Sequence, residues 1–286
     1  MNYDNNKGGS GRVGQVKEVT SLSNPIVKDI KALSNKKDRE QSGTFMAEGL
    51  KLVIDALELG WTIRILVYAK AAKGKPLVEQ VAARTVAKGG LVLEVSEKVL
   101  SSITRRDNPQ MVVGIFEQRW APLNDLQPAK GTTYVALDRV RDPGNLGTII
   151  RTADAAGASG VILVGECTDP FSLETVRATM GSVFAVPLAR ATTEEFFAWQ
   201  KRSGAQVVAT HLAGAVDYRT VDYDKKPTVL LMGNEQSGLP EALARAADRL
   251  VRIPQQGRAD SLNLAVATAV MLFEARRHLL KLEDAK

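Results

Sequence analysis

The sequence has a single cysteine, Cys167, and only two histidines among its 286 residues. A disulfide framework requires paired cysteines and a Cys/His zinc site requires several such ligands, so neither is expected. The longest apolar run, residues 264–273, is interrupted by Thr268 and falls far short of the about 20 residues of a membrane span. No apolar segment of the signal-peptide type follows the first residue. These absences predict a soluble protein of a reducing compartment, in the simplest case the cytoplasm, with no membrane association.

What is present is an ordinary globular composition, with 44% hydrophobic and 24% charged residues. This composition excludes collagen-like, fibrous and wholly disordered chains, and the length predicts about two domains. The net charge of +6 is uneven, because residues 1–125 carry 19 basic and 14 acidic side chains, whereas residues 126–286 carry 19 and 18. A basic first half indicates a polyanionic partner such as nucleic acid. The alternative is a mildly basic surface that is only solvated.

The first part of the chain reads as a leader followed by a small α/β domain. Residues 1–18 hold almost nothing to bury, which predicts a disordered leader. Residues 19–118 form the domain, and residues 119–133, with two prolines and a glycine, predict a linker. Within the domain, the apolar periodicity predicts a helix from residue 21, further helices over 47–59, 77–88 and 99–103, and strands over 63–68, 91–95 and 111–117.

Residues 134–286 predict a second α/β domain with a parallel sheet. Strand patterns alternate with helical ones, which favours a sheet covered by helices on both faces. In such sheets ligands bind beyond the carboxyl ends of the strands, so the loops that follow strands are the informative ones. The strands are expected over residues 134–138, 161–164, 183–187, 206–210 and 228–232, and the first helix over 146–156.

The first informative loop lies in DPGNLGTIIRTADAAG, residues 142–157. Asn145 can cap the helix that starts at residue 146, and Arg151 lies off the apolar stripe of that helix. Its guanidinium is therefore free to reach the strand ends. A solvated surface arginine is the alternative, but Gly144 and Asn145 favour a loop that backbone or ligand approaches closely.

The second loop lies in LLMGNEQSGLP, residues 230–240, where a strand ends at Met232 and Pro240 stands where a helix begins. A polar loop between glycines can hold a small molecule through backbone groups. The third segment, IPQQGRADSLNLAVATA, starts at residue 253, and Ser261 or Asn263 can cap a helix that runs to about residue 282. That helix is apolar nearly all round, which indicates burial against a partner subunit or within one core.

Together and in this order, the three segments resemble the three motifs of the SpoU/TrmH family. These are SPOUT-class RNA ribose 2′-O-methyltransferases that use S-adenosylmethionine. The resemblance covers residues 134 to about 280. Residues 20–118 resemble the family's L30e-like substrate-binding domain, although Met111 stands where that domain has glycine; the residues that carry this resemblance are NPIVKDIKAL, Phe45, Glu48, Gly49, Asn108, Pro109 and Gln110.

The resemblance implies a deep trefoil knot in the second domain, an exception to the rule that chains are unknotted. It also implies that S-adenosylmethionine binds in the knot and that a homodimer forms there. Gly233, Ile253 and Leu262 would contact the cofactor largely through backbone groups, with Thr210 and Met232 as neighbours. No metal is required.

The resemblance further assigns Arg151 as the catalytic arginine that activates or orients the ribose hydroxyl. Four residues would line the site around it: Asn145, Glu235, Ser261 and Asn263. A ribose 2′-hydroxyl must lose its proton as the methyl group transfers. Arginine is an unusual base because its pKa exceeds about 12. Arg151 could instead stabilise the developing alkoxide or hold a phosphate, and the sequence does not separate these roles.

The basic first domain then gains a role in binding structured RNA with an exposed loop nucleotide. We expect 23S ribosomal RNA as the substrate ahead of transfer RNA. A nicotinamide-dependent enzyme is disfavoured, because the first strand lacks the G-x-G-x-x-G that it requires. A non-catalytic RNA-binding relative is disfavoured because every expected motif position is filled. Candidate phosphate contacts are Lys28, Lys31, Lys36, Lys37, Arg39, Arg105 and Arg106.

Overall fold

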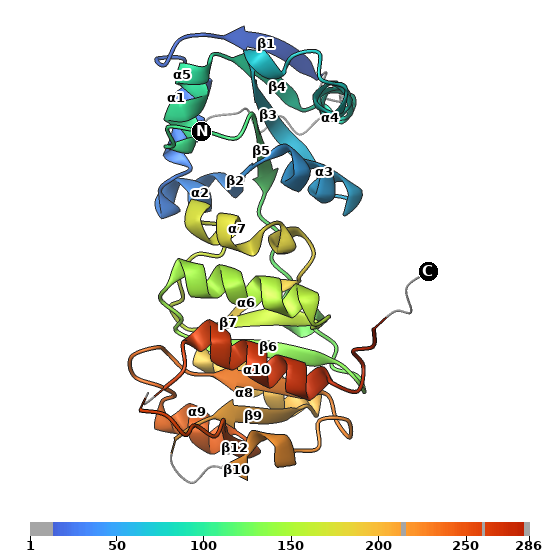
Figure 1. The fold of residues 1–286 in the computed structure, drawn as a ribbon, viewed down its shortest axis with the longest axis vertical. Helices are drawn as coiled ribbons and strands as arrows, with labels where there is room; N and C mark the ends of the chain where they lie inside the picture. The colour runs from blue at the N-terminus through green and yellow to red at the C-terminus, as the bar shows by residue number, and fades with distance from the viewer. Residues whose placement is uncertain (1–13, 213–215, 259–260, 283–286) are drawn as a thin grey trace. The chain divides into compact units, whose positions relative to one another are not determined.

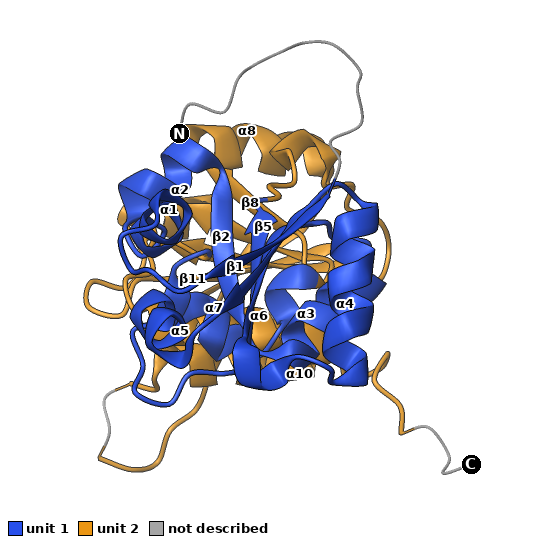
Figure 2. Cartoon of the chain, turned by 90° about the horizontal axis from the view of Figure 1, so that it is seen from above, with its two compact units in different colours: residues 1–118, 171–184 blue, residues 119–170, 185–286 orange. Residues whose placement is uncertain are grey.

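The computed structural model describes residues 14–212, 216–258 and 261–282. The chain divides into two compact units (Figure 2), of which unit 1 comprises residues 1–118 and 171–184. Unit 2 comprises residues 119–170 and 185–286. The single predicted boundary at the linker is therefore incomplete, because residues 171–184 fold with unit 1. No local pattern marks this exchange, since it depends on contacts between distant parts of the chain.

Unit 1 is a five-stranded mixed sheet with helices on both faces (Figure 1). Its strand order is β1-β4-β3-β5-β2, with β5 antiparallel to both neighbours. Helices α1 and α5 pack on one face through residues such as Ile30 and Leu100, and α4 packs against β3 and β4. The elements are β1 (Gln15–Val19), α1 (Pro25–Ala32), α2 (Lys36–Ser42), β2 (Thr44–Glu48), α3 (Leu50–Glu58), β3 (Ile63–Ala69), η1 (Lys70–Ala72), α4 (Pro76–Ala87), β4 (Leu91–Val95), α5 (Glu97–Thr104) and β5 (Val112–Glu117).

Several expectations for unit 1 are corrected. The predicted disordered leader is wrong at residues 15–18, which form most of β1; residues 1–13 lie outside the described part. Because β1 is an edge strand that pairs with β4 through its backbone, most of its side chains stay exposed and leave no apolar pattern. The helix predicted over 47–59 begins only at Leu50, because residues 44–48 form β2 and Gly49 turns the chain at φ 119°. The strand over 91–95 is confirmed.

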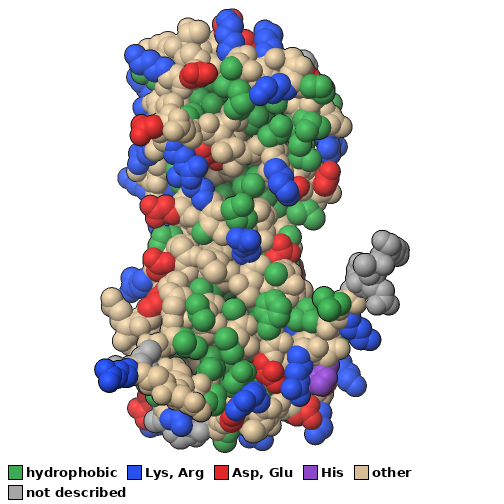
Figure 3. Space-filling view, viewed as in Figure 1, with side chains coloured by type: hydrophobic (Ala, Val, Ile, Leu, Met, Phe, Trp, Pro, Cys, Tyr) green, Lys and Arg blue, Asp and Glu red, His purple; other side chains and the backbone are tan. Residues whose placement is uncertain are grey.

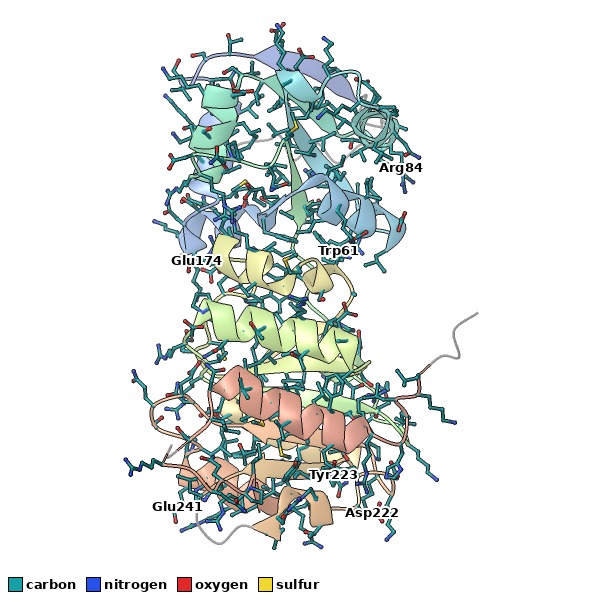
Figure 4. All side chains as sticks on the ribbon, viewed as in Figure 1. Trp61, Arg84, Glu174, Asp222, Tyr223 and Glu241 are labelled. Carbon is teal, nitrogen blue, oxygen red and sulfur yellow. The ribbon has the colours of Figure 1, made fainter. Side chains whose placement is uncertain are left out.

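An aromatic cluster joins residues 171–184 to the rest of unit 1. The ring of Phe171 lies 4.8 Å from that of Phe45, and the ring of Phe184 lies 4.9 Å from that of Phe116. Trp61, labelled in Figure 4, donates a hydrogen bond from Nε1 to the Phe184 carbonyl at 2.9 Å. The strand predicted over 183–187 is therefore wrong: after α7 (Leu173–Thr179), its first residues belong to the turn η3 (Ser182–Phe184), and the strand starts later, at Leu188.

The sheet of unit 2 is wholly parallel, as predicted. It has seven strands, in the order β10-β12-β9-β11-β6-β7-β8, of which β10 and β12 were not predicted. One face packs on α8 and α9 through residues such as Phe196 and Leu243, while α10 contacts α6, β6 and β11. Its elements are η2 (Leu123–Asp125), β6 (Thr133–Asp138), α6 (Pro143–Ala155), β7 (Gly160–Val164), β8 (Leu188–Ala191), α8 (Thr193–Ser203), β9 (Gln206–Thr210), β10 (Val216–Asp217), η4 (Tyr218–Thr220), β11 (Thr228–Met232), α9 (Glu241–Ala246), β12 (Arg249–Arg252) and α10 (Leu264–Arg276).

The path of the chain after β12 places the last helix. β12 pairs with β9 on the side away from β11, whereas α10 packs against α6 near the middle of the sheet. Helix α10 ends at Arg276 and not near residue 282; the Arg276 guanidinium donates to the carbonyls of Ala156 and Gly131. The trefoil knot stays a prediction. Among the described residues, no helix has both the length and the apolarity to cross a membrane.

The aromatic cluster generates a stability prediction. Phe171→Ala removes a 1%-exposed ring from the core of unit 1, and we expect a loss of about 3–5 kcal/mol in the free energy of unfolding. Urea unfolding followed by tryptophan fluorescence measures it, since Trp61 lies in the same cluster. Leu77→Ala is the control, because Leu77 is 53% exposed and should change stability by less than about 0.5 kcal/mol. An equal, small effect of both substitutions would contradict the packing described here.

Candidate active site

Three loops leave the parallel sheet at its carboxyl edge. β6 and β11 are adjacent and in register, with Leu137 beside Met232, so the loops that follow them start side by side. β12 ends at the same edge, and the segment after it leads into α10. Since ligands of open parallel sheets bind at this edge, the three motif segments share one location for chemistry.

The start of α6 differs from the sequence-based expectation. Asp142 is the N-cap, and its Oδ1 accepts a hydrogen bond from the Asn145 backbone N–H at 2.6 Å. Pro143 takes the first helical position, for which its fixed φ and missing N–H suit it. The predicted cap at Asn145 is therefore wrong. The Asn145 side chain, released from capping, extends toward the loop after β11.

A chain of hydrogen bonds joins the three motifs. Asn145 Nδ2 donates to Glu235 Oε1 at 3.2 Å, and Asn263 Nδ2 donates to Asn145 Oδ1 at 2.9 Å. The other oxygen of Glu235, Oε2, accepts from the Arg141 backbone N–H at 3.3 Å. The structure thus brings together three of the predicted site residues, although Asn145 lies 90 positions from Glu235 and 118 positions from Asn263 in the chain.

Asn263 has a second task as the N-cap of α10. Its Oδ1 accepts from the backbone N–H groups of Ala265 at 2.9 Å and Val266 at 3.3 Å. Of the two capping candidates, Asn263 is therefore the one used, and Ser261 is exposed. Because one amide side chain both starts the helix and bonds to Asn145, the position of α10 sets the position of the site.

Arg151 lies on α6 between the buried residues Ile150 and Ala153, and its own side chain is exposed. Its place off the buried stripe agrees with the sequence pattern. Within the described ranges, the Arg151 guanidinium has no hydrogen-bond or ion-pair partner, so it is not part of the Asn145–Glu235–Asn263 chain. An exposed guanidinium without a carboxylate partner keeps its charge available to an anion.

The loop after β11 is closed on itself by backbone contacts. Asn234 and Gly238 exchange two backbone hydrogen bonds of 3.1 and 3.0 Å. A Cβ at Gly233 would lie 2.5 Å from the carbonyl carbon of Gly238, so only glycine fits there. Asn234 was not predicted as a site residue, yet its Nδ2 donates to the Arg139 carbonyl at 2.7 Å and ties this loop to the one after β6.

An ion pair between a buried carboxylate and a partly exposed arginine at the end of β6 was also missed. The Asp138 side chain is 2% exposed and accepts hydrogen bonds from Arg139 Nε and Nη2, which raise the pKa of the Arg139 guanidinium. Arg139 adopts φ 48°, a left-handed conformation uncommon outside glycine and typical of functional loops. The available signal was an acidic residue that ends an otherwise apolar strand.

Four of the five predicted cofactor contacts lie at or just after the ends of neighbouring strands, and the fifth, Leu262, directly precedes the N-cap of α10. Thr210 ends β9 and Met232 ends β11, and Thr210 Oγ1 lies 3.8 Å from Met232 Sδ. Ile253 follows β12 and is half-buried, and Leu262 is 36% exposed. With Gly233, this set supplies apolar cover and loop backbone groups and no side-chain charge, which suits an adenosyl group. In the described part of the chain, no three His, Cys, Asp or Glu side chains form a metal-binding group.

The seven predicted RNA contacts in unit 1 differ in their exposure to solvent. Lys28, Lys36, Lys37 and Arg105 are exposed, Lys31 is half-buried, and the Arg106 side chain is 43% exposed. The prediction that Arg39 contacts phosphate is wrong, because Arg39 is only 3% exposed and its Nη1 donates to the Leu33 carbonyl at 2.8 Å. The Arg39 guanidinium thus serves the carbonyl of Leu33, the C-cap residue of α1. In the sequence, the neighbouring lysines made Arg39 look like one more surface charge.

The tight loop after β11 generates a prediction. Gly233→Ala forces backbone apart at Gly238 and Leu239, and we expect a loss of about 1–3 kcal/mol of unfolding free energy. Gly257→Ala is a matched control, because a Cβ there meets no atom within 4 Å. Chemical unfolding of both variants checks the difference, and equal stabilities would contradict it.

Comparison with known proteins gives a family match for each of two parts of the chain. Residues 132–273 match the SpoU rRNA Methylase family, and residues 24–114 match the MRM3-like substrate binding domain. The chain is 32% identical to the 23S rRNA (guanosine(2553)-2′-O)-methyltransferase RlmP of Bacillus subtilis, over 91% of this chain and 100% of that protein. The tRNA (guanosine(18)-2′-O)-methyltransferase of Escherichia coli is 38% identical over 50% of this chain and 62% of its own length.

Solved structures give the same result. The AdoMet-bound rRNA methyltransferase from Sinorhizobium meliloti has a TM-score of 0.90 and 76% identity, over 94% of this chain and 100% of that chain. The seven strands and the three motif segments of unit 2 all lie within the matched residues 132–273. The chain belongs to the SpoU rRNA methylase family.

Proposed function

We propose that this protein transfers a methyl group from S-adenosylmethionine to a ribose 2′-hydroxyl of 23S ribosomal RNA. The observation that carries the proposal is the Asn145–Glu235–Asn263 hydrogen-bond chain, which assembles the three family motifs at the carboxyl edge of the sheet. We further propose that the protein acts in the cytoplasm, in keeping with a ribosomal RNA substrate.

In this proposal the cofactor lies at the strand ends, in the trefoil knot that the family resemblance implies. Backbone groups of Gly233, Ile253 and Leu262 would hold it, with Thr210 and Met232 as neighbouring side chains. When bound, S-adenosylmethionine supplies a methyl group on a positively charged sulfur. The closed loop keeps the backbone groups around Gly233 in one arrangement, so this part of the site needs little ordering when the cofactor binds.

Arg151 acts on the ribose oxygen in this proposal. A guanidinium stays protonated at neutral pH and makes a poor base, but its charge stabilises an oxygen that becomes negative. As the ribose oxygen gained the methyl group, its proton would pass to solvent and the methyl–sulfur bond would break, leaving a neutral thioether. Asn145 and Glu235, held by each other and by Asn263, orient the ribose and need not change protonation.

The extent of similarity favours ribosomal over transfer RNA. The Bacillus subtilis 23S rRNA enzyme is similar over both units, whereas the Escherichia coli tRNA enzyme is similar over only half of this chain. Unit 1 matches a substrate-binding domain, and an enzyme that keeps such a domain has a larger surface for RNA. Transfer RNA stays the second candidate.

The first test is methyl transfer from labelled S-adenosylmethionine to unmodified 23S rRNA and, separately, to tRNA transcripts. We expect label in 23S rRNA as a 2′-O-methylnucleoside. Arg151→Ala should lower the rate about 10²–10³-fold with unchanged cofactor affinity, because it removes one charge from the transition state. Arg151→Lys should recover part of the rate, since it keeps the charge.

Other outcomes would separate the parts of this proposal. Label in tRNA alone would support the proposed methyl transfer and would show that 23S rRNA is not the substrate. A full rate in Arg151→Ala would remove the catalytic role of Arg151. Failure of the protein to bind S-adenosylmethionine would refute the proposed methyltransferase activity.

We also propose that two copies of the chain pair through α10. Figure 3 shows hydrophobic side chains gathered over this helix, where Val266 is 50% and Phe273 47% exposed. The buried face of α10 holds Met271 and Leu272, so the helix is apolar on both faces although the chain covers only one. A second copy would bury the other face.

Phe273→Asp tests the pairing. We expect it to convert a dimer to a monomer in analytical ultracentrifugation without unfolding the chain, because Phe273 is exposed in the single chain. Leu77→Asp on α4 is the control, as Leu77 is exposed to a similar extent outside α10. A wild-type monomer, or a dimer that survives Phe273→Asp, would rule out this interface.

A further inference from the structure

A short polar loop in unit 1, residues 105–110, is held at both of its ends. The loop connects α5 to β5. At its start, the Thr104 carbonyl accepts a hydrogen bond from Arg177 Nη2 at 2.8 Å. At its end, the Gln110 backbone N–H donates to Glu48 Oε1 at 3.0 Å. A loop fixed in this way presents its side chains in a defined arrangement.

The two anchoring side chains bind each other. Arg177 Nε and Nη2 donate to Glu48 Oε2 at 3.1 and 2.7 Å, and the Glu48 side chain is only 2% exposed. We refer to this pair as the Arg177–Glu48 clamp. Both donors bind the same carboxylate oxygen, and hydrogen bonds between two charged groups are stronger than those between neutral groups. Arg177 belongs to α7, within the segment 171–184 that leads from β7 to β8.

The charges around the clamp do not balance. Arg106 Nε lies 3.8 Å from the same Glu48 oxygen that Arg177 binds, so two guanidinium groups share one carboxylate. Arg105, next to them, is exposed and adopts φ 55°. Asp107 is the single acidic residue of the loop. The surplus positive charge favours an anion at this loop, and Arg is well suited to phosphate.

The same loop also carries neutral hydrogen-bonding groups. Asn108 and Gln110 are both exposed, and each side chain offers an amide donor and acceptor. Amide side chains that flank arginines can read the edges of unstacked bases while the arginines hold the backbone. This combination fits RNA better than a free phosphate or an acidic peptide.

We propose that loop 105–110 is an RNA-contact element, with Arg105 and Arg106 on phosphates and Asn108 and Gln110 on base edges. Arg177 and Glu48 are positioning residues that act through this loop. The identity of the RNA rests on the proposed function, namely a stretch of 23S rRNA next to the methylated nucleotide. Contact by the loop can be tested without any methyl transfer.

The experiment compares four variants of the full chain with wild type. Arg105→Ala/Arg106→Ala removes the contacting charges, Arg177→Lys and Glu48→Gln loosen the clamp, and Lys98→Ala removes an exposed charge from neighbouring α5 as a control. For each, the Kd for a 23S rRNA transcript is measured by filter binding at several salt concentrations. The Kd for S-adenosylmethionine, kcat and the KM for RNA are measured in parallel.

We expect the double variant to raise the Kd and the KM for RNA about tenfold. The slope of log Kd against log salt concentration should become shallower by about 0.7 for each lost phosphate contact. The affinity for S-adenosylmethionine and kcat should not change. Arg177→Lys keeps its charge, so a rise in RNA KM in this variant reports the placement of the loop and not electrostatics alone. Glu48→Gln should act in the same direction, and Lys98→Ala should leave the RNA Kd within twofold of wild type.

Each contrary outcome has a distinct meaning. An unchanged RNA Kd in the double variant overturns the contact. A changed RNA Kd in the double variant, with wild-type values in Arg177→Lys and Glu48→Gln, refutes the positioning role of the Arg177–Glu48 clamp. Partial unfolding would lower kcat and leave KM unchanged, and this pattern in the clamp variants also counts against positioning. RNA binding without methyl transfer by wild type refutes only the proposed function, whereas absence of RNA binding refutes both.

Discussion

The register between β6 and β11 is the constraint on which the site depends. These strands are parallel neighbours with Leu137 beside Met232, so their loops begin together. Glu235 can then accept a hydrogen bond from Asn145. A slip of one residue would turn every side chain of the strand to the other face and would carry Glu235 away from its partner. The site is thus a property of sheet pairing.

Helix α10 completes this arrangement because of how it begins. Its N-cap, Asn263, uses one side-chain oxygen for the helix and its amide nitrogen for Asn145. Packing of α10 against α6 brings the two residues together, since Asn145 lies in the first turn of α6. The same packing leaves an apolar face with Phe273 exposed, which connects the geometry of the site to the proposed pairing of two copies.

Unit 1 shows a different kind of dependence, between a domain and a distant segment. Residues 171–184 supply Phe171 and Phe184 to its aromatic core and Arg177 to the Glu48 carboxylate. Burial of Glu48 is tolerable because arginine and a backbone N–H satisfy it. The Glu48, Gly49 and Asn108–Gln110 signature of the substrate-binding domain therefore has a structural explanation: the carboxylate holds the loop that contains the second part of the signature.

The sequence alone predicted the two α/β domains, the parallel sheet, most central strands and, through the motif resemblance, the grouping of Asn145, Glu235 and Asn263, which hydrogen bonds join in the structure. These depend on apolar periodicity and on motif residues, which are local properties of the chain. Tertiary structure decided what has no local signature. Edge strand β1 is held by backbone pairing, Arg39 turns inward to serve the Leu33 carbonyl, and Val183 and Phe184 are buried in unit 1 instead of forming a strand. In each case the deciding partner lies outside the local pattern, so only the folded chain brings it within reach.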